Sequence, residues 1–183
     1  ELIQAYFQNS NSRFSDLNIS YVKENKRMGT AGSLGLIQDL DETFLVMNGD
    51  VLTTLDYSKL VAYHRKKNAV LTIAMHRKRV KIDLGVIETD SAGFLTEYIE
   101  KPEKPYLVSM GVYIYEPDVL KYIKPNIYLD FPDLVIRLME NGEKVAGYPC
   151  DDYWLDIGRH EDYNRAQNEY HKMKKRLLPN RKK

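Results

Sequence analysis

The stretch Phe44-Leu45-Val46-Met47-Asn48-Gly49-Asp50 decides the fold class, because it joins a short apolar run to a polar turn. Four consecutive apolar residues are typical of a strand buried on both faces, as in a parallel sheet. In open α/β sheets, ligands bind beyond the carboxyl ends of such strands. Asp50 therefore stands where a carboxylate could hold a hard cation such as Mg²⁺. Asn-Gly-Asp is also a good turn sequence, so a structural role stays open.

Helix and strand patterns alternate around this stretch. Asp56 suits the N-cap of a helix over Tyr57–Lys67, whose apolar residues recur at helical spacing. Ala69–Met75 predicts a second buried strand, and Glu1–Gln8 has the pattern of a helix. We therefore expect residues 1–75 to form βα units of a doubly wound sheet.

The middle of the chain has the pattern of a mixed sheet with hairpins. Leu84–Glu88 and Phe94–Tyr98 are rich in strand formers and flank the turn cluster Asp90–Gly93, which predicts a hairpin. Val108–Tyr115 predicts a further strand. The other expected elements are a short helix from Pro117, a helix over 133–141, strands over 144–148 and 153–155, and a closing helix over 161–177. The predicted fold class is α/β with a doubly wound mixed sheet.

Composition bounds the class of protein. The chain has 183 residues, 43% of them hydrophobic and 29% charged, which suits one globular domain. No apolar run approaches the roughly 20 residues that span a membrane, and Glu1–Gln4 lacks the features of a signal peptide. The single cysteine, Cys150, cannot form an internal disulfide. We therefore expect a reducing, cytoplasmic location and no membrane partner.

Charge is distributed unevenly along the chain. Residues 171–183 contain seven Lys or Arg residues and no acid, which leaves residues 1–170 with 20 basic and 26 acidic residues. An acidic body argues against a nucleic-acid-binding domain. We expect the basic tail to be a solvated helix end, although such a tail could also touch phosphate or membrane.

Three further segments have the composition of ligand-binding turns. Arg27–Leu34 holds two glycines at a predicted helix start, where backbone N–H groups face anions or polar rings. Glu100-Lys101-Pro102 places a lysine, a point charge for phosphate, at a strand end. Tyr153–Gly158 places Asp156 after another short apolar strand. Each also has a structural interpretation: a helix-entry turn, a solvated ion pair and a helix cap, respectively.

The order of these segments is specific. The motifs are Met28-Gly29-Thr30-Ala31-Gly32-Ser33, Phe44–Asp50, Glu100-Lys101-Pro102, Gly111-Val112-Tyr113 and Trp154-Leu155-Asp156-Ile157-Gly158. Together they resemble the sugar-1-phosphate nucleotidyltransferases (nucleoside-diphosphate-sugar pyrophosphorylases), over the whole chain except the basic tail. The resemblance implies a Rossmann-like fold and attack of a sugar-1-phosphate oxygen on the α-phosphorus of a nucleoside triphosphate. Trp154–Asp162 and Phe131–Leu134 look most like the guanylyltransferase branch, which acts on mannose or heptose phosphates.

The resemblance also implies roles for individual residues. Asp50 and Asp156 would be catalytic and would hold Mg²⁺, and Lys101 would contact the sugar phosphate. Glu100 would bind sugar hydroxyls, and Gly85 would let the backbone approach the sugar. The other substrate-binding positions implied are Gly29, Thr30, Ala31 and Gly32 against the base, and Asn48, Gly49, Ser109 and Gly111 elsewhere in the substrate site. Many members have Asn at the position of Ser109, which leaves the sugar open.

One family feature is not found in the sequence. Members usually begin with a strand and a Gly-x-Gly-Thr-Arg loop that cradles the triphosphate, and no Gly-x-Gly occurs here. We therefore expect residues 1–170 to be a nucleotidyltransferase domain without its glycine-rich N-terminal segment, inactive alone. Loss of the first strands would leave a sheet edge open to pairing.

Two other functions stay open at this point. A relative without the triphosphate loop could bind a nucleotide sugar or regulate a partner without catalysis. A metal-dependent glycosyltransferase could use Asn48–Asp50 as its metal site, although Glu100–Pro102 and Trp154–Gly158 fit it poorly. Tyrosine-rich stretches leave room for a homo-oligomer interface. His64 and His76 lack the spacing of a metal site and are expected to be structural.

Overall fold

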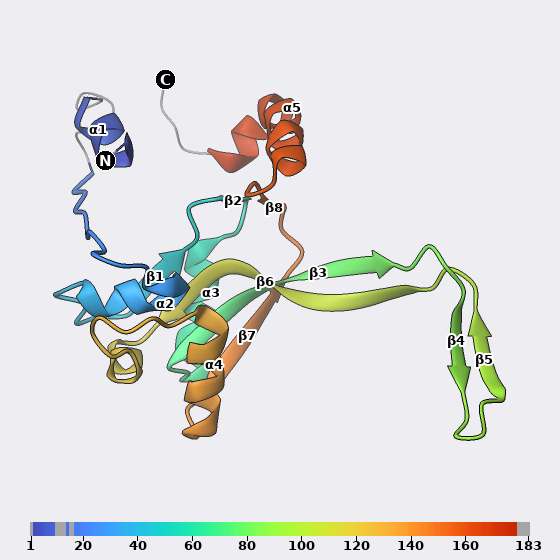
Figure 1. Ribbon diagram of the computed structural model, residues 1–183. Helices are drawn as coiled ribbons and strands as arrows, with labels where there is room; N and C mark the ends of the chain where they lie inside the picture. The colour runs from blue at the N-terminus through green and yellow to red at the C-terminus, as the bar shows by residue number, and fades with distance from the viewer. Residues whose placement is uncertain (1, 10–13, 15–16, 179–183) are drawn as a thin grey trace.

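The computed structural model describes residues 2–9, 14 and 17–178, and its centre is a four-stranded mixed sheet (Figure 1). The strands of this sheet lie in the order β1 (Phe44–Met47), β6 (Glu103–Tyr115), β3 (Leu71–Lys81) and β7 (Val145–Cys150). β6 is antiparallel to both of its neighbours, whereas β3 and β7 are parallel. The other strands are β2 (Val51–Thr53), β4 (Val86–Thr89), β5 (Leu95–Ile99) and β8 (Trp154–Asp156). The expected α/β class with a mixed sheet is confirmed.

Helices cover both faces of the sheet. The helices of the described residues are α1 (Leu2–Asn9), α2 (Gly29–Gly32), η1 (Ser33–Leu36), α3 (Tyr57–Lys67), η2 (Pro117–Tyr122), α4 (Phe131–Glu140) and α5 (His160–Leu177). Those that pack on the sheet are α2, η1, η2 and α4 on one face and α3 on the other. Successive side chains of a strand point to opposite faces, so β6 contributes to two separate cores. Tyr113 and Tyr115 pack with α2, η1, η2 and α4, whereas Val112 and Ile114 pack with α3. Apolar residues on both faces explain why this strand was readily recognised in the sequence.

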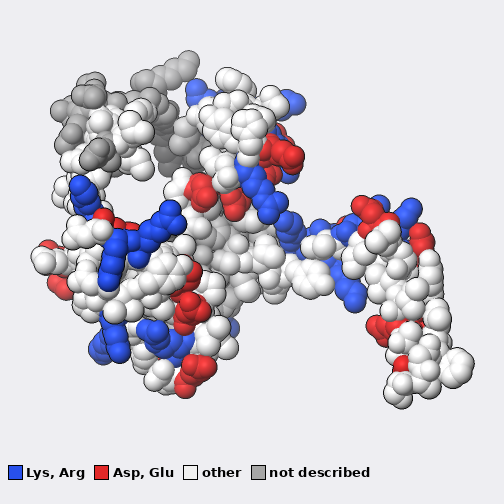
Figure 2. All heavy atoms as spheres, viewed as in Figure 1, with Lys and Arg blue, Asp and Glu red and all other residues white. Residues whose placement is uncertain are grey.

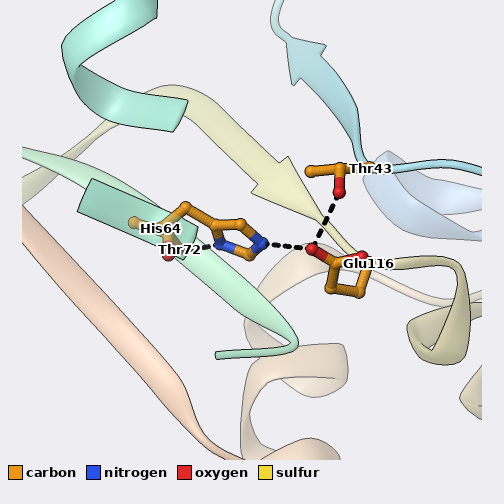
Figure 3. A network of polar contacts seen from close by, with 4 residues as sticks. All are labelled: Thr43, His64, Thr72 and Glu116. Atoms are coloured by element: carbon orange, nitrogen blue, oxygen red, sulfur yellow. Dashed lines mark hydrogen bonds and ion pairs between the residues drawn. The ribbon is translucent and has the colours of Figure 1, made fainter. Parts of the chain in front are cut away.

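A buried histidine joins α3 to the sheet (Figure 3). His64, which is 1% exposed, has Nδ1 2.7 Å from Oγ1 of Thr72 and Nε2 2.8 Å from Oε1 of Glu116. Thr43, directly before β1, donates to the same carboxylate oxygen at 2.9 Å. A carboxylate only accepts, so Nε2 carries a hydrogen and donates to it. The network therefore ties α3, β3, the end of β6 and the start of β1 together.

Replacing His64 by alanine should lower the free energy of unfolding by about 3 kcal/mol, because it opens a cavity and leaves Thr72 and Glu116 without their partner. Urea denaturation of the two proteins measures this difference. His160→Ala is the matched control, because His160 is exposed and should change stability by less than about 0.5 kcal/mol. Equal midpoints for the two variants would contradict a structural role for the network.

β1 is an edge strand of the sheet, and the prediction that it is buried on both faces is wrong. Among the described residues it pairs only with β6, and this pairing is antiparallel. Leu45 and Met47 are 42% and 37% exposed, whereas Phe44 and Val46 pack against the core. A four-residue apolar run cannot distinguish these cases, because an edge strand with apolar residues on its outer face has the same pattern as a buried one.

β3 and β6 extend beyond the sheet as a two-stranded ribbon that ends in the β4–β5 hairpin (Figure 1). We call this ribbon and hairpin, residues 77–107, the arm. The predicted hairpin is confirmed, but the strands predicted over 69–75 and 108–115 are too short. Residues 77–81 are all exposed and include four basic side chains. No apolar alternation therefore marks them as strand, and only pairing with the neighbouring chain segment does.

Candidate active site

A short two-stranded sheet brings the two predicted metal ligands together. Asp50 lies in the turn between β1 and β2, and Asp156 is the last residue of β8. β2 pairs antiparallel with β8, which sets Val51 opposite Asp156. The N–H of Ile157 donates to the carbonyl oxygen of Asp50 at 2.8 Å. These pairings hold the two aspartates side by side.

The two carboxylates converge on Gly158. A β-carbon at position 158 would lie 3.0 Å from Oδ2 of Asp50 and 3.1 Å from Oδ1 of Asp156. Both aspartates are exposed, and the N–H of Gly158 donates to Oδ1 of Asp156 at 2.9 Å. The described part of the chain has no group of three or more His, Cys, Asp or Glu side chains that could hold a metal. The pair fits Mg²⁺, which takes one or two carboxylates and completes its shell with phosphate and water oxygens.

Gly158→Ala should weaken divalent-cation binding about tenfold, because the added methyl group would press on both carboxylates. The fold should persist, since Gly158 does not have the left-handed φ that favours glycine. Calorimetric titration with Mn²⁺ measures the affinity, and a thermal melt checks the fold. Gly49→Ala is the control, because a β-carbon there meets nothing within 4 Å. Unchanged Mn²⁺ affinity in Gly158→Ala would rule out a cation between these carboxylates.

A cavity of about 280 Å³ opens beside Asp156. Tyr113, Phe131 and Trp154 form much of its apolar wall. Five of the predicted site residues also line it: Thr30, Asn48, Ser109, Gly111 and Asp156. An apolar cavity with a few converging polar groups is the usual form of a small-molecule site. We call it the central cavity.

Hydrogen bonds fix the polar wall of the central cavity. The N–H of Asn48 donates to the carbonyl oxygen of Gly111 at 2.9 Å, and the N–H of Gly111 donates to Oγ of Ser109 at 3.3 Å. Ser109 in turn donates to the hydroxyl of Tyr113 at 3.2 Å, and burial raises the pKa of that hydroxyl. Gly111 has a φ of 71°, and a β-carbon there would lie 2.8 Å from Nδ2 of Asn48. Only glycine suits this position, because the irregularity of β6 opposite Ile73 and Met75 brings its backbone against the Asn48 side chain.

The N–H groups of residues 30–32 in the glycine turn are not free, contrary to expectation. The N–H groups of Ala31 and Gly32 both donate to the carbonyl oxygen of Leu129 at 3.0 Å. The N–H of Thr30 donates to Oδ1 of Asp130, also at 3.0 Å. Hydrogen bonds from Tyr128 and Thr30 hold the pKa of Asp130 below its ordinary value. The two glycines serve close packing, Gly29 against residues 129 and 130 and Gly32 against residues 127 and 129, and of this turn Thr30 lines the central cavity.

Gly85, Glu100 and Lys101 lie on the arm and do not line the central cavity (Figure 1). Lys101 has a left-handed φ of 46°, and its Nζ is 4.0 Å from Oε1 of Glu100. Glu100 also accepts a hydrogen bond of 3.2 Å from the hydroxyl of Tyr98, against which Gly85 packs. The structure therefore groups these three predicted residues together but separates them from Asp50 and Asp156.

Sequence reasoning assigned no role to Phe131 or Trp154, which the structure places in the wall of the central cavity. Trp154 also donates from Nε1 to the carbonyl oxygen of Met110 at 2.9 Å, which fixes its ring. Both residues begin segments that were already singled out, Phe131–Leu134 and Trp154–Gly158. For Trp154 the available signal was an aromatic residue two positions before the strand-end acid Asp156.

A sequence model described as nucleotidyl transferase matches residues 1–173. The chain belongs to the nucleotidyl transferase family. The UTP–glucose-1-phosphate uridylyltransferase of Synechocystis sp. is 35% identical over 188 residues, which cover 91% of this chain and 47% of that protein. The mannose-1-phosphate guanylyltransferase of Mycobacterium tuberculosis is 30% identical over 156 residues, which cover 82% of this chain and 44% of that protein. This nucleotidyl transferase chain thus spans about half the length of the curated relatives it matches.

A solved structure supports the fold of this chain. HddC from Yersinia pseudotuberculosis superposes with a TM-score of 0.62 at 22% identity, over 90% of this chain and 73% of that one. Within the described residues, no helix combines the length and apolar character needed to cross a bilayer. The candidate site sets an exposed carboxylate pair beside a polar-lined cavity, an arrangement that can hold a hard cation next to a small polar ligand.

Proposed function

We propose that the protein transfers a nucleoside monophosphate from a nucleoside triphosphate to a sugar-1-phosphate, giving a nucleoside-diphosphate sugar and pyrophosphate. The observation that carries this proposal is the convergence of Asp50 and Asp156 on Gly158, beside a cavity lined by Asn48 and Ser109. Family membership supports the same reaction class. It gives no support to a glycosyltransferase.

In the proposed reaction, a phosphate oxygen of the sugar-1-phosphate forms a bond to the α-phosphorus. The bond from the α-phosphorus to the oxygen bridging to the β-phosphorus breaks, and pyrophosphate leaves. Mg²⁺ held by Asp50 and Asp156 would supply charge neutralisation for the phosphates. Lys101 would contact the sugar phosphate and Glu100 the sugar hydroxyls, so the arm would have to lie over the central cavity during the reaction. Such chemistry depends mostly on positioning and electrostatics.

Two substrate pairs have specific support. The segments Trp154–Asp162 and Phe131–Leu134 favour GTP with a mannose- or heptose-1-phosphate. The 35% identity to a uridylyltransferase over 91% of the chain favours UTP with glucose-1-phosphate. Ser109, rather than a larger amide side chain, borders the central cavity and leaves the sugar open.

A coupled pyrophosphate-release assay tests the proposal. The full-length protein is given each nucleoside triphosphate together with glucose-, mannose- or heptose-1-phosphate, with Mg²⁺ present. Release that needs one nucleotide and one sugar phosphate together would establish the activity and name both substrates. If a folded protein that binds Mn²⁺ releases no pyrophosphate with any pair, the catalytic proposal is wrong. Binding of a nucleotide sugar would then identify a non-catalytic module.

A further inference from the structure

A second cavity, of about 350 Å³, shares Trp154 and Asp156 with the central cavity but has a different charge. Three cationic side chains line it: Lys78 of β3, Arg159 before α5, and Arg165 in α5. Basic side chains run from the foot of α5 onto the β3–β6 ribbon (Figure 2). We call it the basic cavity. The proposed reaction assigns no role to these three cationic side chains.

Two of the three cations have no partner among the described residues. Arg165 donates to Oε1 of Glu169 at 2.8 Å, which neutralises it. The side chains of Lys78 and Arg159 make no hydrogen bond or ion pair within the described part of the chain, and both residues are exposed to the solvent. The basic cavity therefore presents two cationic side chains without an ion-pair partner next to Asp156.

A buried polar atom of the same cavity also lacks a partner. Nδ1 of His76 is buried, and no described group forms a hydrogen bond with it. The His76 ring packs against the indole of Trp154, with centroids 5.6 Å apart, which fixes its orientation. A buried unpaired ring nitrogen is costly, and such exceptions in native proteins call for an explanation. His76 thus borders the basic cavity with a ring nitrogen that no described group pairs.

The two aspartates that line the basic cavity, Asp156 and Asp162, are compatible with a bound phosphate. Asp156 is one of the proposed Mg²⁺ ligands, and phosphate oxygens complete the shell of protein-bound Mg²⁺. Asp162 lies in the first turn of α5, where a negative side chain is favourable without any ligand. Asp156 and the two unpaired cations thus line one cavity, in which a phosphate would contact both the protein cations and a Mg²⁺ held by Asp156.

We propose that Arg159 and Lys78 bind a phosphate group of the reactants in the basic cavity, beside Asp156. The planar guanidinium of Arg159 suits two phosphate oxygens, and the ammonium of Lys78 acts as a point charge. The reactants follow from the proposed function, but the phosphate site does not depend on turnover. Its ligand is either the phosphate of a sugar-1-phosphate or the pyrophosphate end of the nucleotide.

Trp154 is the only tryptophan of the chain and borders the basic cavity, so its fluorescence reports binding there without an activity assay. We expect inorganic pyrophosphate or glucose-1-phosphate, titrated with Mg²⁺ present, to change this fluorescence and saturate. Arg159→Gln and Lys78→Gln should each weaken that binding about tenfold or more. The anion whose affinity falls identifies the source of the phosphate.

Arg79→Gln is the matched control, because Arg79 follows Lys78 on β3, points to the opposite face and pairs with Glu103 at 3.4 Å. It should bind the anions as the parent protein does. Unchanged affinity in Arg159→Gln and Lys78→Gln, or an equal loss in Arg79→Gln, would overturn the phosphate site. Neither result bears on pyrophosphate release, so the two proposals fail separately.

Discussion

Replacing Asp50 or Asp156 by asparagine should lower turnover about a thousandfold, the largest effect on activity that we expect. Asparagine keeps the size of the side chain but removes its charge. The two carboxylates converge on Gly158, where a single cation can contact both. Each variant should therefore also lose most of its affinity for Mn²⁺. The double variant should be little worse than either single one, because the two residues act through one ion.

Pyrophosphate release by the full-length protein and calorimetric Mn²⁺ titration measure these effects. Asp41→Asn is the control, because Asp41 is an exposed acid before β1, whereas Asp50 follows that strand. It changes the net charge equally and should keep both activity and Mn²⁺ affinity. An Asp50 or Asp156 variant that loses turnover but retains full Mn²⁺ affinity would place the aspartate in another role.

The prediction that Asp50 and Asp156 belong to one site agrees with the structure, but for an incomplete reason. Asp50 and Asp156 were predicted from their positions after short apolar strands, and the structure brings them together. The expected reason was a parallel sheet, whereas the pair is joined by the antiparallel β2 and β8. Strands of three residues carry almost no periodicity, so their pairing could not be predicted from the sequence.

Features that depend on contacts between segments far apart in the chain could not be predicted from the sequence. The N–H groups of residues 30–32 are satisfied by residues 129 and 130, about a hundred positions away. Lys78 and Arg159 come together in one cavity although each is unremarkable in its own segment. Lys101 lies apart from the aspartates because the β3–β6 ribbon is long. The length of this ribbon could not be predicted, because its charged residues show no strand pattern. Local propensity reports none of these, because each is set by tertiary packing.

Gly29→Ala should lower the free energy of unfolding by about 3 kcal/mol, the largest single-residue effect on stability that we expect away from His64. Gly29 has a φ of 76°, and a β-carbon there would lie 2.5 Å from the carbonyl oxygen of Leu129. That oxygen already accepts hydrogen bonds from Ala31 and Gly32. The obstacle is backbone, so it cannot rotate away as a side chain would. The turn at residues 29–32 must separate from residue 129 to admit the methyl group.

Gly93→Ala isolates the cost of the clash, because Gly93 has a similar φ of 86° but nothing lies within 4 Å of an added β-carbon. It should lose only about 1 to 2 kcal/mol, the cost of a left-handed conformation for a residue with a side chain. Urea denaturation of both variants gives the difference. If both lose the same stability, the contact with Leu129 contributes nothing beyond the backbone conformation. If Gly29→Ala loses more, Thr30 should also shift in the central cavity, and nucleotide affinity should fall with stability.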